Sequence, residues 1–127
     1  MKLSRAQIQY LLMIYEMLEK GPVRLRDIAD ALQVSKPSVH GMEEQFVRLG
    51  LLEKRRYAPV QMTEIGKQLA QEYKVSLSLL SESLANTFQL SSGIARESAL
   101  ALLGEWSEEY RIQVCLCLHR QKTDELD

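Results

Sequence analysis

Residues 25–44 have the sequence LRDIADALQVSKPSVHGMEE, whose pattern leaves few possible folds. Apolar residues recur there at helical spacing on both sides of a short turn at residues 33–35. Ser35 is a favourable N-cap, Pro37 suits a first helical turn, and the small Ala29 lets two helices cross closely. We therefore expect two helices, over residues 26–32 and 35–49, in a helix-turn-helix. The residues expected to fill their shared core are Ile28, Leu32, Val34, Val39 and Met42.

A strand-turn-strand directly after such a motif makes it a winged helix, and the next residues fit that order. Residues 51–52 and 60–62 are short apolar runs that we predict to be strands. The tip between them is basic and aromatic and contains a proline: Lys54, Arg55, Arg56, Tyr57, Ala58 and Pro59. Before the motif, residues 4–20 have the pattern of an amphipathic helix, which Gly21 and Pro22 end.

The rest of the chain is predicted to be helical and partly covered by a partner. A helix over residues 64–88 carries one long apolar stripe: Ile65, Leu69, Tyr73, Leu77, Leu80, Leu84 and Phe88. This stripe is longer than the first half of the chain can cover. Two further helices are expected over residues 94–103 and 107–120, and the second is apolar on more than one side. These surfaces favour a homodimer formed through the last three helices.

A helix-turn-helix binds duplex DNA by placing its second helix in the major groove, while basic side chains and helix N-termini hold phosphates. Ser35, Lys36 and Ser38 begin that helix and carry donors suited to phosphates and nearby bases. Arg24 and Arg26 lie at the start of the first helix, which crosses the DNA backbone in such motifs. Arg55 and Arg56 on the wing can reach phosphates or an adjacent minor groove. The residues expected to face DNA are Arg24, Arg26, Ser35, Lys36, Pro37, Ser38, His40, Gly41, Arg55, Arg56 and Tyr57.

Three residues of the second helix leave alternatives open. Gly41 costs a helix about 1 kcal/mol relative to alanine. It either lets the backbone approach the duplex, or leaves room for a thymine methyl group, or makes no contact. His40 is either a phosphate contact or an ordinary surface histidine. Glu44 would repel phosphate or accept a hydrogen bond from a cytosine amine, and a solvated position suits it better.

The charge distribution indicates that the two halves of the chain have different functions. Residues 1–74 carry 12 Lys and Arg against 9 Asp and Glu, a net charge of +3, whereas residues 75–127 carry 4 against 8, a net charge of −4. We expect a mainly α fold with a winged helix-turn-helix DNA-binding domain over residues 1–74. A helical dimerisation region over residues 75–120 and a flexible tail over residues 121–127 would follow.

The cysteines and the apolar segments indicate a cytoplasmic protein. Cys115 and Cys117 are too close in sequence for an ordinary disulfide, which favours free, buried thiols in a reducing compartment. No segment approaches the roughly 18 consecutive apolar residues of a membrane span, and no leader-type cleavage site follows the N-terminus. We therefore expect no membrane partner.

Residues 8–74 resemble the diphtheria-toxin-repressor family of iron- and manganese-dependent repressors. The resemblance lies in IYEML at residues 14–18, DIADAL at 27–32, VSKPSV at 34–39, GLLEK at 50–54 and MTEIGKQLA at 62–70. It implies a homodimer that binds palindromic operators, with Ser35, Pro37 and Ser38 facing DNA. The family has a polar side chain where this chain has Gly41, so base readout differs there.

The same resemblance implies a metal site whose ligands this chain lacks. The family's ligand positions fall on Gln9, Leu12, Leu77, Ala99, Leu102 and Leu103. Divalent metals need carboxylate, imidazole or thiolate ligands, and the last four side chains supply none. We therefore expect no cofactor at this site. Cys115 and His119 would share a helical face, but two ligands do not close a metal site without help from another residue or subunit.

The sequence thus favours a homodimeric DNA-binding regulator, most simply a repressor, that is constitutive or responds to a small molecule held among the last three helices. One alternative is a metal-responsive repressor with a relocated site. Another is a winged helix that binds protein instead of DNA. An enzyme is disfavoured, because the sequence has no glycine-rich phosphate loop and only two histidines, 79 positions apart.

Overall fold

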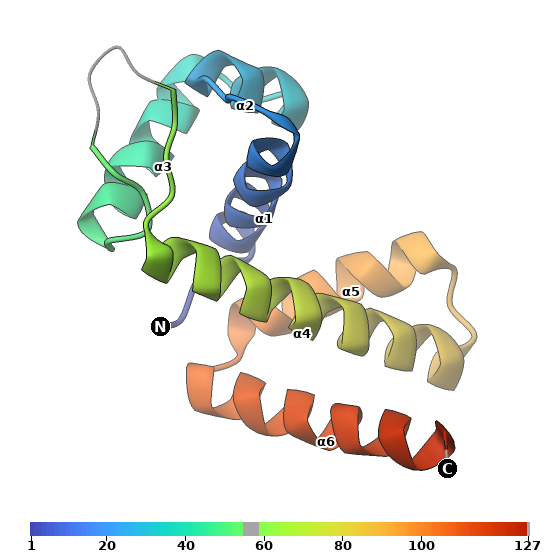
Figure 1. Ribbon diagram of the computed structural model, residues 1–127. Helices are drawn as coiled ribbons and strands as arrows, with labels where there is room; N and C mark the ends of the chain where they lie inside the picture. The colour runs from blue at the N-terminus through green and yellow to red at the C-terminus, as the bar shows by residue number, and fades with distance from the viewer. Residues whose placement is uncertain (55–58, 127) are drawn as a thin grey trace. The chain divides into compact units, whose positions relative to one another are not determined.

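The computed structural model describes residues 1–54 and 59–126 of the 127-residue chain. Six α-helices follow one another in the described residues (Figure 1). They are α1 (Arg5–Lys20), α2 (Leu25–Leu32), α3 (Lys36–Arg48), α4 (Glu64–Phe88), α5 (Ser92–Glu105) and α6 (Glu108–Leu126). The chain forms two compact units: the HTH unit, residues 9–71, and the helical unit, residues 1–8 and 72–127. The mainly α fold with an N-terminal helix-turn-helix is as predicted.

The HTH unit contains the predicted motif, with one correction in its turn. Gln33 adopts a left-handed backbone conformation, with φ 55°, and the Val34 N–H donates to the Ala29 carbonyl oxygen at 3.1 Å. Ile28 and Val39 are 1% and 2% exposed and lie in the core. Val34 is 36% exposed, so its predicted place in the core is wrong. The left-handed residue ends α2 abruptly, and the turn leaves the next side chain at the surface.

The wing begins where predicted but is paired less extensively than expected. Leu52 and Met62 form an isolated antiparallel bridge, and the Glu53 N–H donates to the Gln61 carbonyl oxygen at 2.9 Å. The Val60 N–H donates to the Val23 carbonyl oxygen at 2.7 Å, which ties the wing to the segment before α2. Among the described residues this pairing is a bridge, not two full strands. The wing-tip residues Arg55, Arg56 and Tyr57 lie outside the described residues.

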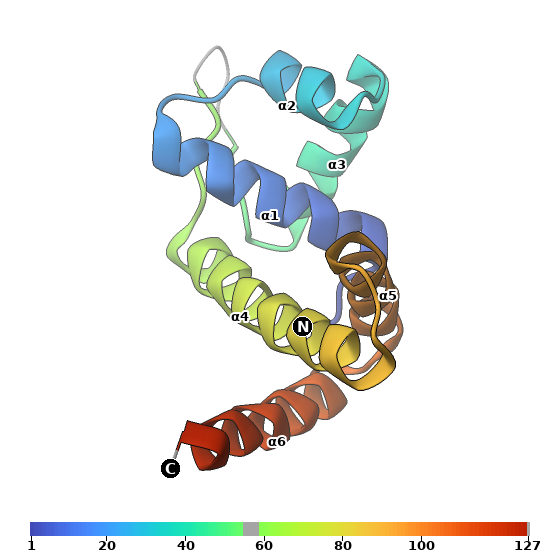
Figure 2. The same ribbon diagram turned by 90° about the vertical axis from the view of Figure 1, so that its right-hand side faces the viewer.

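The helical unit runs along α4, back along α5 and forward again along α6 (Figures 1 and 2). Figure 2 shows that α4 and α6 cross at an angle. Two ion pairs join them: Arg111 to Glu72 at 3.4 Å near their beginnings, and Lys122 to Glu82 at 3.2 Å farther along. The core of this unit is mostly apolar, although Ser76 and Arg111 are also buried. The apolar side chains that are at most 3% exposed are Leu3, Ile8, Tyr73, Leu77, Ala95, Ala99, Leu100 and Leu103.

Two predicted boundaries differ from the structure. Helix α6 continues to Leu126, so the helix end predicted at residue 120 is wrong. The Lys122–Glu82 pair binds this extra length to α4. Residues 1–8, which the sequence grouped with the DNA-binding half, pack with the helical unit. None of the helices in the described part of the chain has the length and hydropathy needed to cross a bilayer.

Candidate DNA-binding surface

Helix α3 has one buried side and one side open to solvent. Val39 and Phe46 are 2% and 0% exposed and hold the helix in the core of the HTH unit. At 3.6 residues per turn, the residues on the opposite side are Pro37, Gly41, Glu44, Gln45 and Arg48. All of them except the half-buried Gly41 are exposed. This outer face of α3, defined by these five residues, is available to a ligand.

The start of α3 combines a cap with exposed donors. The Ser35 hydroxyl oxygen accepts a hydrogen bond from the Ser38 N–H at 3.2 Å, as the sequence indicated for an N-cap. A serine hydroxyl also carries one O–H donor, so this cap leaves Ser35 able to donate outward. Ser35, Lys36, Pro37 and Ser38 are all exposed. The helix dipole adds a positive potential here, which suits an anion such as a phosphate.

The beginning of α2 presents the second group of predicted residues. Arg24 is the N-cap residue, and its N–H donates to the Asp27 carboxylate at 2.9 Å. This bond fixes the backbone of the first turn, and both Arg24 and Arg26 remain exposed. His40 is also exposed on α3. These side chains share the HTH unit with the start of α3, but their contacts with DNA remain a prediction.

Gly41 occupies open space in the described structure. A Cβ atom built on it would meet no atom within 4 Å, and its backbone is not in the left-handed region. Nothing within the described protein therefore requires glycine here, although glycine weakens a helix. A requirement for close approach by an external ligand is consistent with this geometry.

Two basic residues near this face were not among the residues expected to face DNA. Arg48 lies seven residues after Gly41, on the same side of α3, and Lys54 begins the wing. They line a hollow of about 340 Å³ together with Glu43, Glu44 and Val47. The spacing of Arg48 from Gly41 was a usable signal. The place of Lys54 beside the end of α3 depends on tertiary structure and had no local signal.

The helical unit gives a physical test of the metal site implied by the family resemblance. Leu77 is 3% exposed, and Ala99 and Leu103 are 0% exposed, so aliphatic side chains fill these positions. They offer no lone pair to a cation. Within residues 1–54 and 59–126, no group of three or more His, Cys, Asp or Glu side chains is placed to hold a metal ion. The residues present do not fit the family's metal.

The cysteines are more accessible than predicted. Cys115 is half-buried, whereas Cys117 is exposed, so the expectation of two buried thiols is wrong for Cys117. The two residues lie two positions apart on α6 and therefore point to different sides of the helix. His119 is exposed as well.

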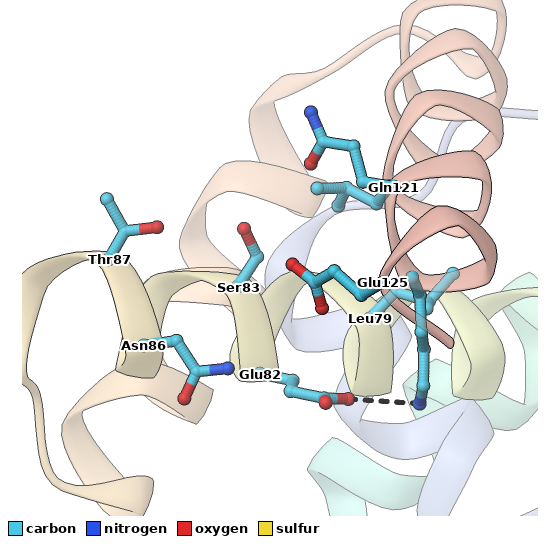
Figure 3. A pocket seen from close by; sticks show the side chains of 9 residues that line it. Leu79, Glu82, Ser83, Asn86, Thr87, Gln121 and Glu125 are labelled. Carbon is cyan, nitrogen blue, oxygen red and sulfur yellow. Dashed lines mark hydrogen bonds and ion pairs between the residues drawn. The ribbon is translucent and has the colours of Figure 1, made fainter. Parts of the chain in front are cut away.

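A groove between α4 and α6 is the place where a small molecule among these helices would be sought (Figure 3). Its volume is about 130 Å³, and its lining includes the Glu82–Lys122 ion pair. Pockets for drug-sized ligands have volumes of about 300–1,000 Å³ and mostly apolar walls. The groove is smaller and more polar than that. It therefore gives no support to the expectation of a small-molecule effector of that size.

Known proteins share the helix-turn-helix and the fold. A sequence profile of the IclR helix-turn-helix domain matches residues 16–56. No curated protein sequence matches the chain. The structure of the manganese regulator SloR is 24% identical with a TM-score of 0.75, and the match covers 94% of this chain and 55% of that one.

Two other solved structures are similar. The structure of ScaR with bound Zn²⁺ is 24% identical with a TM-score of 0.71, covering 89% of this chain and 53% of that one. The hypothetical protein SSo2273 from Sulfolobus solfataricus is 22% identical with a TM-score of 0.69, covering 94% of this chain and 88% of that one. The chain spans about half the length of SloR and ScaR. At these identities the likeness establishes the shared fold alone.

Proposed function

We propose that this chain is a homodimeric DNA-binding transcriptional regulator, most simply a repressor. The observation that carries the proposal is the exposed start of α3, where Ser35, Lys36 and Ser38 surround a helix N-terminus. Phosphates bind such a site through N–H and O–H donors and a basic side chain. The shared helix-turn-helix and the similarity to the manganese regulator SloR support the same function.

The proposed homodimer uses the apolar surface of the helical unit. Ile94 on α5 is 57% exposed, and Ile112 and Leu116 on α6 are 44% and 56% exposed. Ile112 and Leu116 are four residues apart and lie on one side of α6. Large apolar side chains at neighbouring positions favour burial against a partner, and a second copy supplies a matching surface.

The proposed regulator does not use the metal site of the family that it resembles. The aliphatic residues at those positions support this part, since a buried leucine or alanine cannot replace a carboxylate or an imidazole. Duplex affinity should therefore be the same with added manganese and with a chelator.

Salt dependence of duplex binding tests the proposal. We expect Lys36→Ala to reduce the slope of log affinity against log salt by about 0.9, the value for one lost phosphate contact. Arg96→Ala is the matched control, because Arg96 is exposed on α5 and its replacement removes the same single positive charge as Lys36→Ala. Arg55→Ala with Arg56→Ala should flatten the slope further. Equal slopes for wild type and Lys36→Ala would contradict the assigned surface.

A winged helix that binds protein is the competing function. It predicts salt-independent association with a protein and no duplex binding from any sequence pool. A selection of bound DNA from a random duplex pool separates these functions directly.

A further inference from the structure

The segment before the HTH unit contacts helices α4 and α5 of the helical unit. The Leu3 side chain is 0% exposed, and its N–H donates to the Tyr73 hydroxyl on α4 at 3.3 Å. Arg5 forms an ion pair with Glu97 on α5. These residues are close to the start of α1, which continues as one helix into the HTH unit.

A glycine makes the closest of these contacts possible. A Cβ atom built on Gly104 of α5 would lie 2.7 Å from the Arg5 backbone nitrogen and 3.0 Å from its Cα. A Cβ atom essentially never lies 2.7 Å from a backbone nitrogen, so any larger residue at position 104 must displace the start of α1. Gly93, on the same helix, has no atom within 4 Å of the equivalent position.

A buried arginine supports the tyrosine that receives the Leu3 N–H. The Arg111 guanidinium lies 4.5 Å from the centre of the Tyr73 ring, and Arg111 is 2% exposed. Its ion pair with Glu72 is 3.4 Å long, and its Nε has no hydrogen-bond partner among the described residues. The guanidinium therefore packs against the same ring whose hydroxyl accepts the Leu3 N–H, and it restricts the movement of that ring.

The fastened segment is itself rigid. The Gln7 N–H donates to the Ser4 hydroxyl at 3.2 Å, and the Ser4 N–H donates to the Gln7 side-chain oxygen at 2.9 Å. This reciprocal pair is a capping box, which fixes the first turn of α1. Farther along the same helix, Leu11 and Leu12 are 0% and 3% exposed in the core of the HTH unit.

We propose that residues 3–8 form a strap through which the helical unit controls the order of α1 in the HTH unit, with Gly104, Tyr73 and Arg111 as its fastening residues. In this proposal no effector is needed, because the contacts of residues 3–8 with the helical unit keep the helix-turn-helix able to bind duplex DNA. Its effect on duplex affinity rests on the proposed function, whereas its effect on α1 does not.

Hydrogen–deuterium exchange on the full-length chain tests the strap. Gly104→Ala and Tyr73→Phe should each speed exchange in residues 3–8 by about tenfold, since each weakens one local closing contact. The control variants Gly93→Ala and Tyr110→Phe should exchange like wild type, because both sites are exposed. Gly104→Ala should also speed exchange in residues 9–20 and weaken duplex binding about fivefold or more.

Three results would overturn the strap. One is unchanged exchange of residues 3–8 in Gly104→Ala. Another is faster exchange there with wild-type exchange in residues 9–20. The third is loosened α1 with unchanged duplex affinity. A wild-type chain that binds no duplex would refute the proposed function. The exchange rate of residues 9–20 in Gly104→Ala would then still test the strap, because that measurement needs no DNA.

Discussion

Replacing Gly41 by alanine separates the stability of the fold from its binding to DNA. The added methyl group meets no atom within 4 Å, so the folded protein can accept it without a shift. Alanine in the interior of a helix is favoured over glycine by about 1 kcal/mol. For a chain of this size, that gain corresponds to a rise in melting temperature of roughly 3–5 °C. Because Gly41 lies in the middle of the outer face of α3, the same methyl group should reduce duplex affinity.

Thermal melting and fluorescence anisotropy with a selected duplex measure the two effects of Gly41→Ala. The expected result is a higher melting temperature together with about tenfold weaker binding, the loss that one misplaced methyl group causes in a close-packed interface. A lower melting temperature would refute the inferred open space around Gly41. A higher melting temperature with unchanged affinity would show that this face of α3 makes no close approach to DNA.

Three further predictions concern the assembly, the metal and the core. Ile112→Glu combined with Leu116→Glu should give a monomer in analytical ultracentrifugation, whereas Gln113→Glu should not; a dimer in both cases would exclude the proposed interface. Manganese or zinc should leave the melting temperature unchanged, while a metal bound at 100 times its Kd would add about 2.7 kcal/mol and raise it by several degrees. Gly66→Ala should destabilise the chain by about 1–3 kcal/mol in urea denaturation, because its Cβ would collide with the Leu51 carbonyl oxygen; wild-type stability would contradict that packing.

The sequence predicted the features that depend on local patterns. The cap at Ser35 and the buried positions Ile28 and Val39 follow from spacing and side-chain chemistry over a few residues. Hydrophobic periodicity and capping act within one or two helical turns, so they can be recognised in a single sequence.

Two of the features that were wrong or missed depend on distant contacts. Helix α6 extends past residue 120, and there Lys122 pairs with Glu82, 40 positions away. The strap was not foreseen because Leu3 meets Tyr73, 70 positions away. The error at Val34 is different, because it is local: the left-handed conformation of the neighbouring Gln33 leaves the Val34 side chain exposed, although its spacing fits the core.

The central claim is that the start of α3 binds duplex DNA without a metal switch. A selection from a random duplex pool, run in parallel with manganese and with a chelator, tests it most directly. We expect one enriched palindromic sequence, the same in both conditions, whose binding weakens steeply with salt. Enrichment only with manganese would contradict the loss of the metal switch, and no enrichment in either condition would contradict DNA binding itself.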